Sequence, residues 1–297
     1  MPRLFRLAGL TALAGGIVMV AAATWPIGHE ANVVMAGDAQ RGAYLARASG
    51  CIACHTDFAA GGPPLAGGPD LPTPFGTLFA PNLTTDPEHG IGDWDLSSFA
   101  KAVRQGISPD GEPYYPAFPY PFYANFSDQD VADLWAAFQT VPPVAQASRS
   151  NAMRFPFNQR WGLKFWRAAF LRTPATEPVK GKSSEWNRGR ALVEGAAHCG
   201  ACHTPRNLVG ARKANARLMG NAAIPGEGKA PRIDPKGLRS RNWAKEDIAY
   251  ALQTGVTVDG DAFGGPMGEV VLHGTQYLTE LDRRAIATYL LDEESEN

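Results

Sequence analysis

The sequence predicts an all-α protein that consists of two tandem copies of one helical unit behind an N-terminal membrane-spanning helix. Three observations support this fold class. Two distant stretches, "GISPDGEPYYPAF" at 106–118 and "GVTVDGDAFGGPM" at 255–267, share a glycine and a later Asp-Gly pair in register. Each copy shows apolar residues at helical spacing and little strand-like alternation. An uncharged apolar run from residue 7 to residue 25 follows Arg3 and Arg6.

The N-terminal run is about long enough to span a bilayer as a helix. Its positive flank places the N-terminus in the cytoplasm, so that the rest of the chain is exported. "AAA" at 21–23 also fits a signal-peptidase site. Residues 1–36 are therefore predicted to be a membrane anchor or a signal, followed by a tether.

Length and charge limit the function classes. With 297 residues, the chain has room for about two domains. A net charge of −1 gives no global field that points to nucleic acid. Residues 37–150 hold 5 Lys/Arg against 12 Asp/Glu, whereas residues 151–297 hold 21 against 16. This asymmetry indicates either docking surfaces for charged protein partners or solvated faces without a partner.

The four cysteines form two Cys-x-x-Cys-His motifs, "CIACH" at 51–55 and "CGACH" at 199–203. This is the attachment signature of c-type haem. The two thiols add to the two vinyl groups of one porphyrin, and the histidine that follows reaches the iron within the same helical turn. A zinc site or a pair of disulfides uses cysteine pairs too, but neither requires a histidine after each pair. We therefore expect two covalent haem c groups, held by Cys51, Cys54, Cys199 and Cys202.

The remaining elements follow in the same order in both copies. The flanks "RGAYLARASG" and "RGRALVEGAAH" predict a helix before each motif, and "SSFAKAVRQG" and "EDIAYALQTG" predict a second helix that ends at glycine. Ser127 and Thr279 are the expected N-caps of each last helix, with an acid three residues later. The predicted domains are residues 37–145 and 184–297, and residues 146–183 are the linker.

This pattern resembles class I cytochrome c over about 250 residues. The resemblance implies that His55 and His203 are proximal iron ligands. It also implies that Met267, in the loop before the last helix, is the distal ligand of the second haem. Pro81 and Pro231 lie where this fold places a proline beside the proximal histidine, and a nearby carbonyl would accept the Nδ1–H of that ring. Trp94 and Trp243 are expected beside the haem pockets, and Arg206 pairs with a haem propionate or lies on the surface.

More narrowly, the chain is similar to the cytochrome c subunits of membrane-bound periplasmic dehydrogenases for alcohols, aldehydes and sugar acids. "TPFGTLFAPNLTTDPEHGIGDW", "HCGACHTPRNLVGA" and "GPMGEVV" carry this resemblance. It implies a relay that passes electrons from a dehydrogenase to an oxidase or a soluble cytochrome of the respiratory chain. The expected location is the periplasmic face of a bacterial inner membrane, or the periplasm if the N-terminal segment is cleaved. Members of the family commonly have three haem domains, and this chain has room for two.

The first copy departs from the family at the distal position. The family motif Pro-Ala-Met-Pro-Tyr reads Pro-Ala-Phe-Pro-Tyr at 116–120, so that Phe118 stands where Met267 stands in the second copy. Either the first haem has no distal ligand, or another residue supplies it, with His89, Met153 and Tyr114 as candidates, or a shifted loop brings in a further group. An open first haem gives the alternative function, a haem enzyme or a small-ligand sensor.

Overall fold

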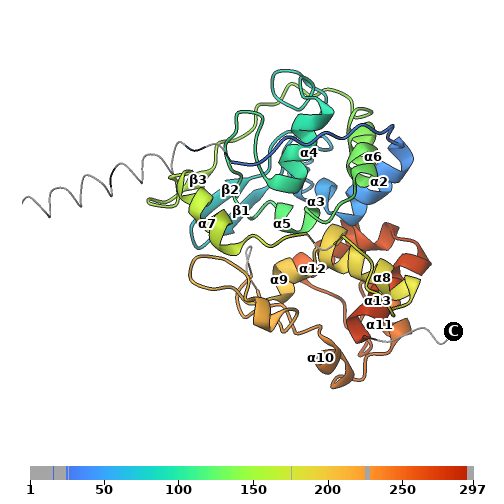
Figure 1. Ribbon diagram of the computed structural model, residues 1–297. Helices are drawn as coiled ribbons and strands as arrows, with labels where there is room; N and C mark the ends of the chain where they lie inside the picture. Colours follow the sequence, from blue (N-terminus) through green and yellow to red (C-terminus); the bar gives the residue numbers. More distant parts are fainter. Residues whose placement is uncertain (1–15, 17–24, 26, 175, 225–227, 293–297) are drawn as a thin grey trace, which may run out of the picture.

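The computed structural model describes residues 16, 25, 27–174, 176–224 and 228–292. The chain forms two helical halves that lie one above the other, joined by the linker (Figure 1). The first half contains α2 (Ala39–Ala48), α3 (Cys51–His55), α4 (Leu96–Gln105), α5 (Tyr120–Tyr123) and α6 (Asp128–Phe138). The linker carries α7 (Gly162–Phe170). The second half contains α8 (Ser184–Ala191), η1 (Leu192–Ala196), α9 (Gly200–His203), η2 (Ala214–Ala216), α10 (Pro235–Arg239), α11 (Lys245–Thr254), α12 (Gly265–His273), η3 (Thr275–Tyr277) and α13 (Glu280–Leu291).

The prediction of an all-α fold is wrong, because the first half and the linker share a small sheet. Strands β1 (Asp70–Thr73), β2 (Gly76–Phe79) and β3 (Ala152–Met153) form an antiparallel sheet in the order β1-β2-β3. The hairpin turn depends on Gly76, whose φ of 134° suits glycine. Strands this short show too few residues for a period of two to be recognised. The third strand is also far away in the sequence.

The prediction of an N-terminal transmembrane helix is not supported either. Among the residues that the structure describes, no helix has both the length and the apolar character needed to cross a membrane. The run from residue 7 to residue 25 falls almost entirely outside those residues, which include only Gly16 and Trp25 of it.

The first and last helices of each half cross at a glycine, and this contact repeats between the halves. A Cβ atom on Gly42 of α2 would lie 1.8 Å from the carbonyl oxygen of Asp133 in α6. A Cβ atom on Gly189 of α8 would lie 1.9 Å from the carbonyl oxygen of Ala285 in α13. Glycine therefore allows the two backbones to touch. The expected caps are confirmed, since Ser127 and Thr279 accept hydrogen bonds from the third residue of α6 and α13.

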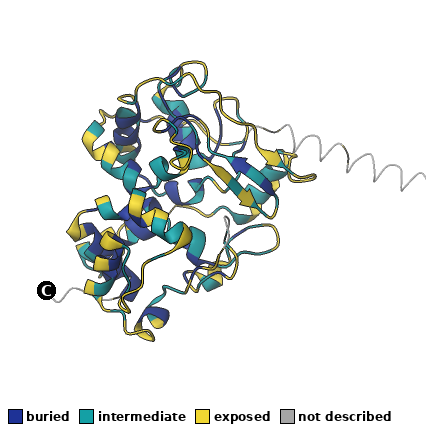
Figure 2. Cartoon of the chain, turned by 180° about the vertical axis from the view of Figure 1, so that it is seen from behind, coloured by how far each residue is buried: buried dark blue, intermediate teal, exposed yellow. Residues whose placement is uncertain are grey.

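The two halves pack against each other through polar and aromatic contacts. The Tyr44 hydroxyl of α2 donates to the Asp282 carboxylate at 2.6 Å and accepts from the backbone N–H of Thr279 at 3.0 Å. The rings of Phe58 and His273 stack with centroids 3.9 Å apart. One continuous group of buried residues runs through both halves, as the dark segments of Figure 2 show.

Candidate cofactor-binding site

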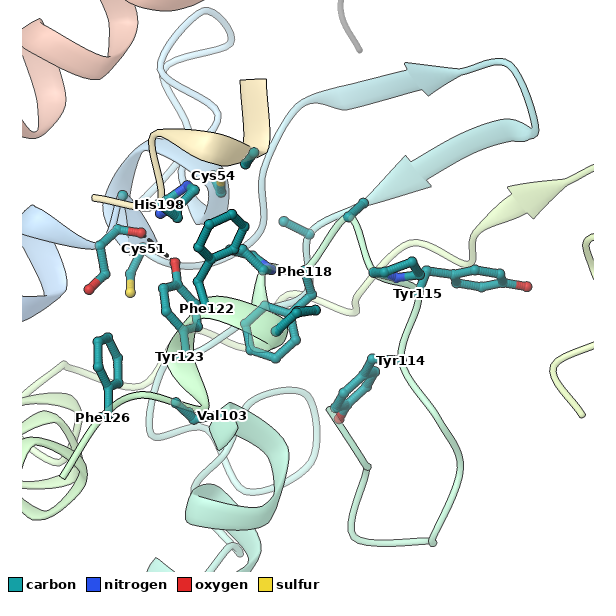
Figure 3. A pocket seen from close by; sticks show the side chains of 18 of the residues that line it. Cys51, Cys54, Val103, Tyr114, Tyr115, Phe118, Phe122, Tyr123, Phe126 and His198 are labelled. Carbon is teal, nitrogen blue, oxygen red and sulfur yellow. Dashed lines mark hydrogen bonds between the residues drawn. The ribbon is translucent and has the colours of Figure 1, made fainter. Parts of the chain in front are cut away.

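A large cavity lies where the halves and the linker meet. Its volume is about 1710 Å³, above the range of about 300–1,000 Å³ that is usual for small-molecule pockets. The wall includes Cys51, Cys54 and His55 from the first half and Cys202 from the second. Figure 3 shows Cys51 and Cys54 beside a group of aromatic side chains at this wall. The space is therefore large enough for more than one extended cofactor.

Both Cys-x-x-Cys-His motifs form one short helical turn, as the sequence predicts. Residues 51–55 form α3, and the second motif runs from the N-cap Cys199 to the end of α9. No disulfide joins any of the four cysteines, all of which lie in the described part of the chain. Among the described residues, no group of three or more His, Cys, Asp or Glu is placed to hold a metal ion. This arrangement suits one separate attachment point per motif.

The two imidazoles are oriented in the same way. Nδ1 of His55 lies 2.7 Å from the Pro81 carbonyl oxygen, and Nδ1 of His203 lies 2.7 Å from that of Pro231. The expected contact beside each proline is thus confirmed. Burial lowers the pKa of His55 to about 4 and also lowers the pKa of His203, which favours the neutral form of each ring. With its proton on Nδ1, each ring keeps the Nε2 lone pair for a metal.

A loop closed by a threonine hydroxyl follows each motif in both copies, and it was not predicted from the sequence. The hydroxyls of Thr56 and Thr204 accept hydrogen bonds from the backbone N–H groups of Leu65 and Leu218, at 3.0 and 3.1 Å. Both leucines have left-handed backbones, with φ of 61° and 59°, and a glycine follows two residues later in each copy. The sequence signal of this loop is the Leu-x-Gly that both copies share. It is hard to recognise because the loops before it differ in length, and because leucine rarely has a left-handed backbone.

The two distal loops have the same backbone over their first nine residues. Gly106 and Gly255 both end a helix with a left-handed backbone. The N–H of Tyr114 then donates to the Gly106 carbonyl at 2.8 Å, and that of Phe263 donates to the Gly255 carbonyl at 2.6 Å. Each pair is separated by the same number of residues, so the structure supports the internal alignment up to this point. Beyond it, the first copy forms a turn and α5, and the second begins α12.

Phe118 lies in an aromatic part of the cavity wall. Its ring centroid is 5.8 Å from those of Tyr114 and Tyr123. Of the alternative ligands, His89 and Tyr114 line the cavity, whereas Met153 lies in β3, paired with Gly76, and is not part of the described wall. Burial raises the pKa of Tyr114 to about 12, so its hydroxyl stays protonated at neutral pH.

The second distal position is different. Met267 is the third residue of α12 and is partly buried against the core, and its neighbours Gly265 and Pro266 line the cavity. Trp94 lines the cavity too, whereas Trp243 packs against the core.

Two arginines add positive charge to the wall. Arg206 donates to the carbonyl oxygens of Gly210 and Ala201, and its Nε is buried without a partner among the described residues. The guanidinium of Arg212 lies 3.8 Å from the centroid of the Phe122 ring. Burial, together with the charge of Arg206, lowers the pKa of Arg212 to about 10. No ion pair joins either arginine to a carboxylate within the described part of the chain. The cavity therefore suits cofactors that carry carboxylates.

Comparison with known proteins adds an independent line of evidence. The family model for cytochrome c matches residues 39–138. A "Diheme cytochrome c-type" protein of Cereibacter sphaeroides is 44% identical over 260 residues, which cover 86% of each chain. The cytochrome c subunit of a quinone alcohol dehydrogenase from Gluconobacter oxydans is 42% identical over 84% of this chain and 54% of the relative. A nicotinate dehydrogenase subunit of Pseudomonas putida is 42% identical over 86% of this chain. The chain spans only 21% of that last protein.

Proposed function

Because this chain belongs to the cytochrome c family and is an electron-transfer protein with two covalently bound haem c groups, we propose that it relays electrons from a dehydrogenase towards the respiratory chain. The observation that carries this proposal is the pair of Cys-x-x-Cys-His turns in one molecule, each with its histidine Nδ1 2.7 Å from a proline carbonyl oxygen. Each bound haem supplies an iron that gains and loses one electron.

The residues of the chain attach and orient these groups. We assign Cys51 and Cys54 to the first haem, and Cys199 and Cys202 to the second. His55 and His203 are the proximal ligands, and the proline carbonyls fix both rings, because each accepts the Nδ1–H at 2.7 Å. Such a contact fixes the tautomer and raises the basicity of a ligating histidine.

We further propose that the two haems differ on their distal sides. Met267 is the distal ligand of the second haem, and a methionine ligand raises the reduction potential. Phe118 cannot coordinate iron, and its aromatic neighbours offer a largely apolar surface. The first haem therefore has the lower potential. Several relatives are cytochrome subunits of dehydrogenases, so the alternative of a haem enzyme or sensor is not favoured.

The dehydrogenase partner is supported by the names of several relatives, which are cytochrome subunits of alcohol, gluconate and fructose dehydrogenases. The chain spans 51 to 58% of the length of these relatives, so the partner and its substrate belong to the proposal. Covalent haem attachment takes place in the bacterial periplasm, which is the location that we propose for the folded protein.

A spectroelectrochemical titration tests this function. The expected result is two haems per chain by the pyridine haemochrome assay, with two separate midpoint potentials and a methionine-ligated spectrum for only the higher one. Replacement of His203 by Ala removes the proximal ligand of the second haem and should abolish the higher step, and the matched variant H55A should abolish the lower step. A single haem per chain, or methionine ligation at both irons, contradicts the proposal.

A further inference from the structure

The residue before the first cysteine of each motif has a positive φ in both copies but a different side chain. In the first copy it is Gly50, with φ of 67°. In the second copy it is His198, with φ of 36°. A positive φ is natural for glycine and strained for a residue with a Cβ atom, although histidine tolerates it better than most residues. The backbone of the second copy is therefore locally strained at His198.

That side chain extends into the other half of the molecule. Cε1 of His198 lies 3.7 Å from where a Cβ atom of Gly50 would be. Its ring centroid is 5.7 Å from that of Tyr123, at an interplanar angle of 88°, and 6.0 Å from that of Phe122. Figure 3 shows the imidazole next to Cys54, within the aromatic group of the first half. One residue thus adjoins Cys199 along the chain and the start of the first motif in space.

The ring is also held in place. Its Nδ1 lies 2.8 Å from the carbonyl oxygen of Ala196, in the turn that precedes it. Tyr123, against which it packs edge-on, donates from its hydroxyl to the Ser49 carbonyl at 2.6 Å, and Ser49 is the residue before Gly50. His198 and Tyr123 therefore connect the segments that enter the two motifs. His198 also lines the common cavity.

From this geometry we infer that His198 is a positioning residue that sets the spacing of the two haem-attachment segments, and thereby the rate at which an electron passes between the haems. The inference rests on the proposed relay function. The haems held by the two motifs would supply the redox chemistry of this step, in which one electron would pass from the reduced haem to the oxidised one. No proton moves, and the imidazole keeps its Nδ1–H on the Ala196 carbonyl. Strain at a functional position is expected where the surrounding structure fixes an uncommon backbone.

The test is H198G, which gives the second copy the residue of the first. Intramolecular transfer is measured by flash reduction of the oxidised dihaem protein with a ruthenium photosensitiser, followed by the absorbance change as the electron moves between the haems. The expected result is a severalfold slower transfer, while both midpoint potentials and the far-UV circular dichroism stay as in the wild type. Unchanged potentials show that the driving force is the same, so that the loss reports the contact between the motifs.

Two further variants separate the ring from the backbone. H198N keeps a residue that tolerates the left-handed backbone but removes the aromatic ring, and it should be as slow as H198G. N242G relieves a comparable φ of 57° at an exposed position and should transfer at the wild-type rate. Wild-type rates in folded H198G and H198N would overturn the inference. Absence of intramolecular transfer in the wild-type protein would instead contradict the relay function itself.

Discussion

Replacement of Gly189 by Ala tests the helix crossing that supports the second haem motif. The new Cβ atom would lie 1.9 Å from the carbonyl oxygen of Ala285. A normal C···O contact is about 3.3 Å, so α8 and α13 must separate by roughly 1.4 Å. Both colliding groups belong to the backbone, and no side-chain rotation relieves the contact. Overpacking of this kind typically costs about 1–3 kcal/mol, and the upper end applies here.

Thermal unfolding followed by circular dichroism measures the effect. If the 297-residue chain unfolds as one unit, a loss of about 3 kcal/mol lowers Tm by roughly 6–12 °C. The haem content should fall as well, because α8 continues through η1 towards Cys199 and a displaced helix moves the thiols. The pyridine haemochrome assay gives this content per chain.

A matched control is Gly162→Ala at the start of α7, where a Cβ atom would meet nothing within 4 Å. Alanine is the better helix former, so G162A should leave Tm unchanged or raise it slightly. A G189A protein that unfolds at the wild-type temperature would refute the argument. A decrease of Tm in G162A as large as that in G189A would also refute it, because the cost would then not come from the contact between α8 and α13.

Three further predictions concern the distal positions and the interface. M267L should lower the potential of the second haem by more than about 60 mV, which is tenfold in a one-electron equilibrium, whereas the potential of the first haem stays constant in the same titration. F118M should raise the potential of the first haem and give it a methionine-ligated spectrum; an unchanged spectrum would contradict the assignment of the distal position. Although burial opposes it, hydrogen bonds from Arg188 and Tyr44 hold the pKa of Asp282 below its usual range. Its contribution to stability is therefore complete above the ordinary carboxyl pKa of about 3.9 and is lost as the pH falls through the lower folded value. D282N should cost about 1.5–3 kcal/mol at neutral pH and flatten this acid dependence in urea titrations, and equal acid sensitivity in the variant would argue against the role of this carboxylate.

Features that depend on local chemistry could be predicted from the sequence. A Cys-x-x-Cys-His turn needs only one helical turn, and both copies form it. The contacts of His55 with Pro81 and of His203 with Pro231 also agree with prediction, because the two prolines occupy corresponding places in the repeat. The Asp-Gly loops agree for the same reason, since the spacing of their backbone hydrogen bonds is identical.

Features that depend on distant partners could not be predicted. Strand β3 is two residues long and is a strand only because it pairs with Gly76 and Thr77 of β2. The left-handed backbones of Leu65 and Leu218 depend on the threonine hydroxyl to which each N–H donates. His198 directly precedes the second Cys-x-x-Cys-His motif, but its contact with Gly50 exists only when the two halves are packed together. In each case the deciding interaction joins segments that the sequence keeps apart.

The positions that repeat and the positions that differ have different tasks. Gly42 and Gly189 are both glycine because a backbone oxygen of the last helix occupies the space of a Cβ atom. At such positions only one residue type satisfies the geometry, and the copies agree. No backbone atom crowds a Cβ atom at Gly50, and the second copy has His198 there in spite of a positive φ; at the other differing position of the wall, Phe118 stands where the second copy has Met267. A shared scaffold can therefore hold two chemically identical cofactors, and under the proposed ligand assignment the side chains that differ at the cavity would give the two haems different reduction potentials.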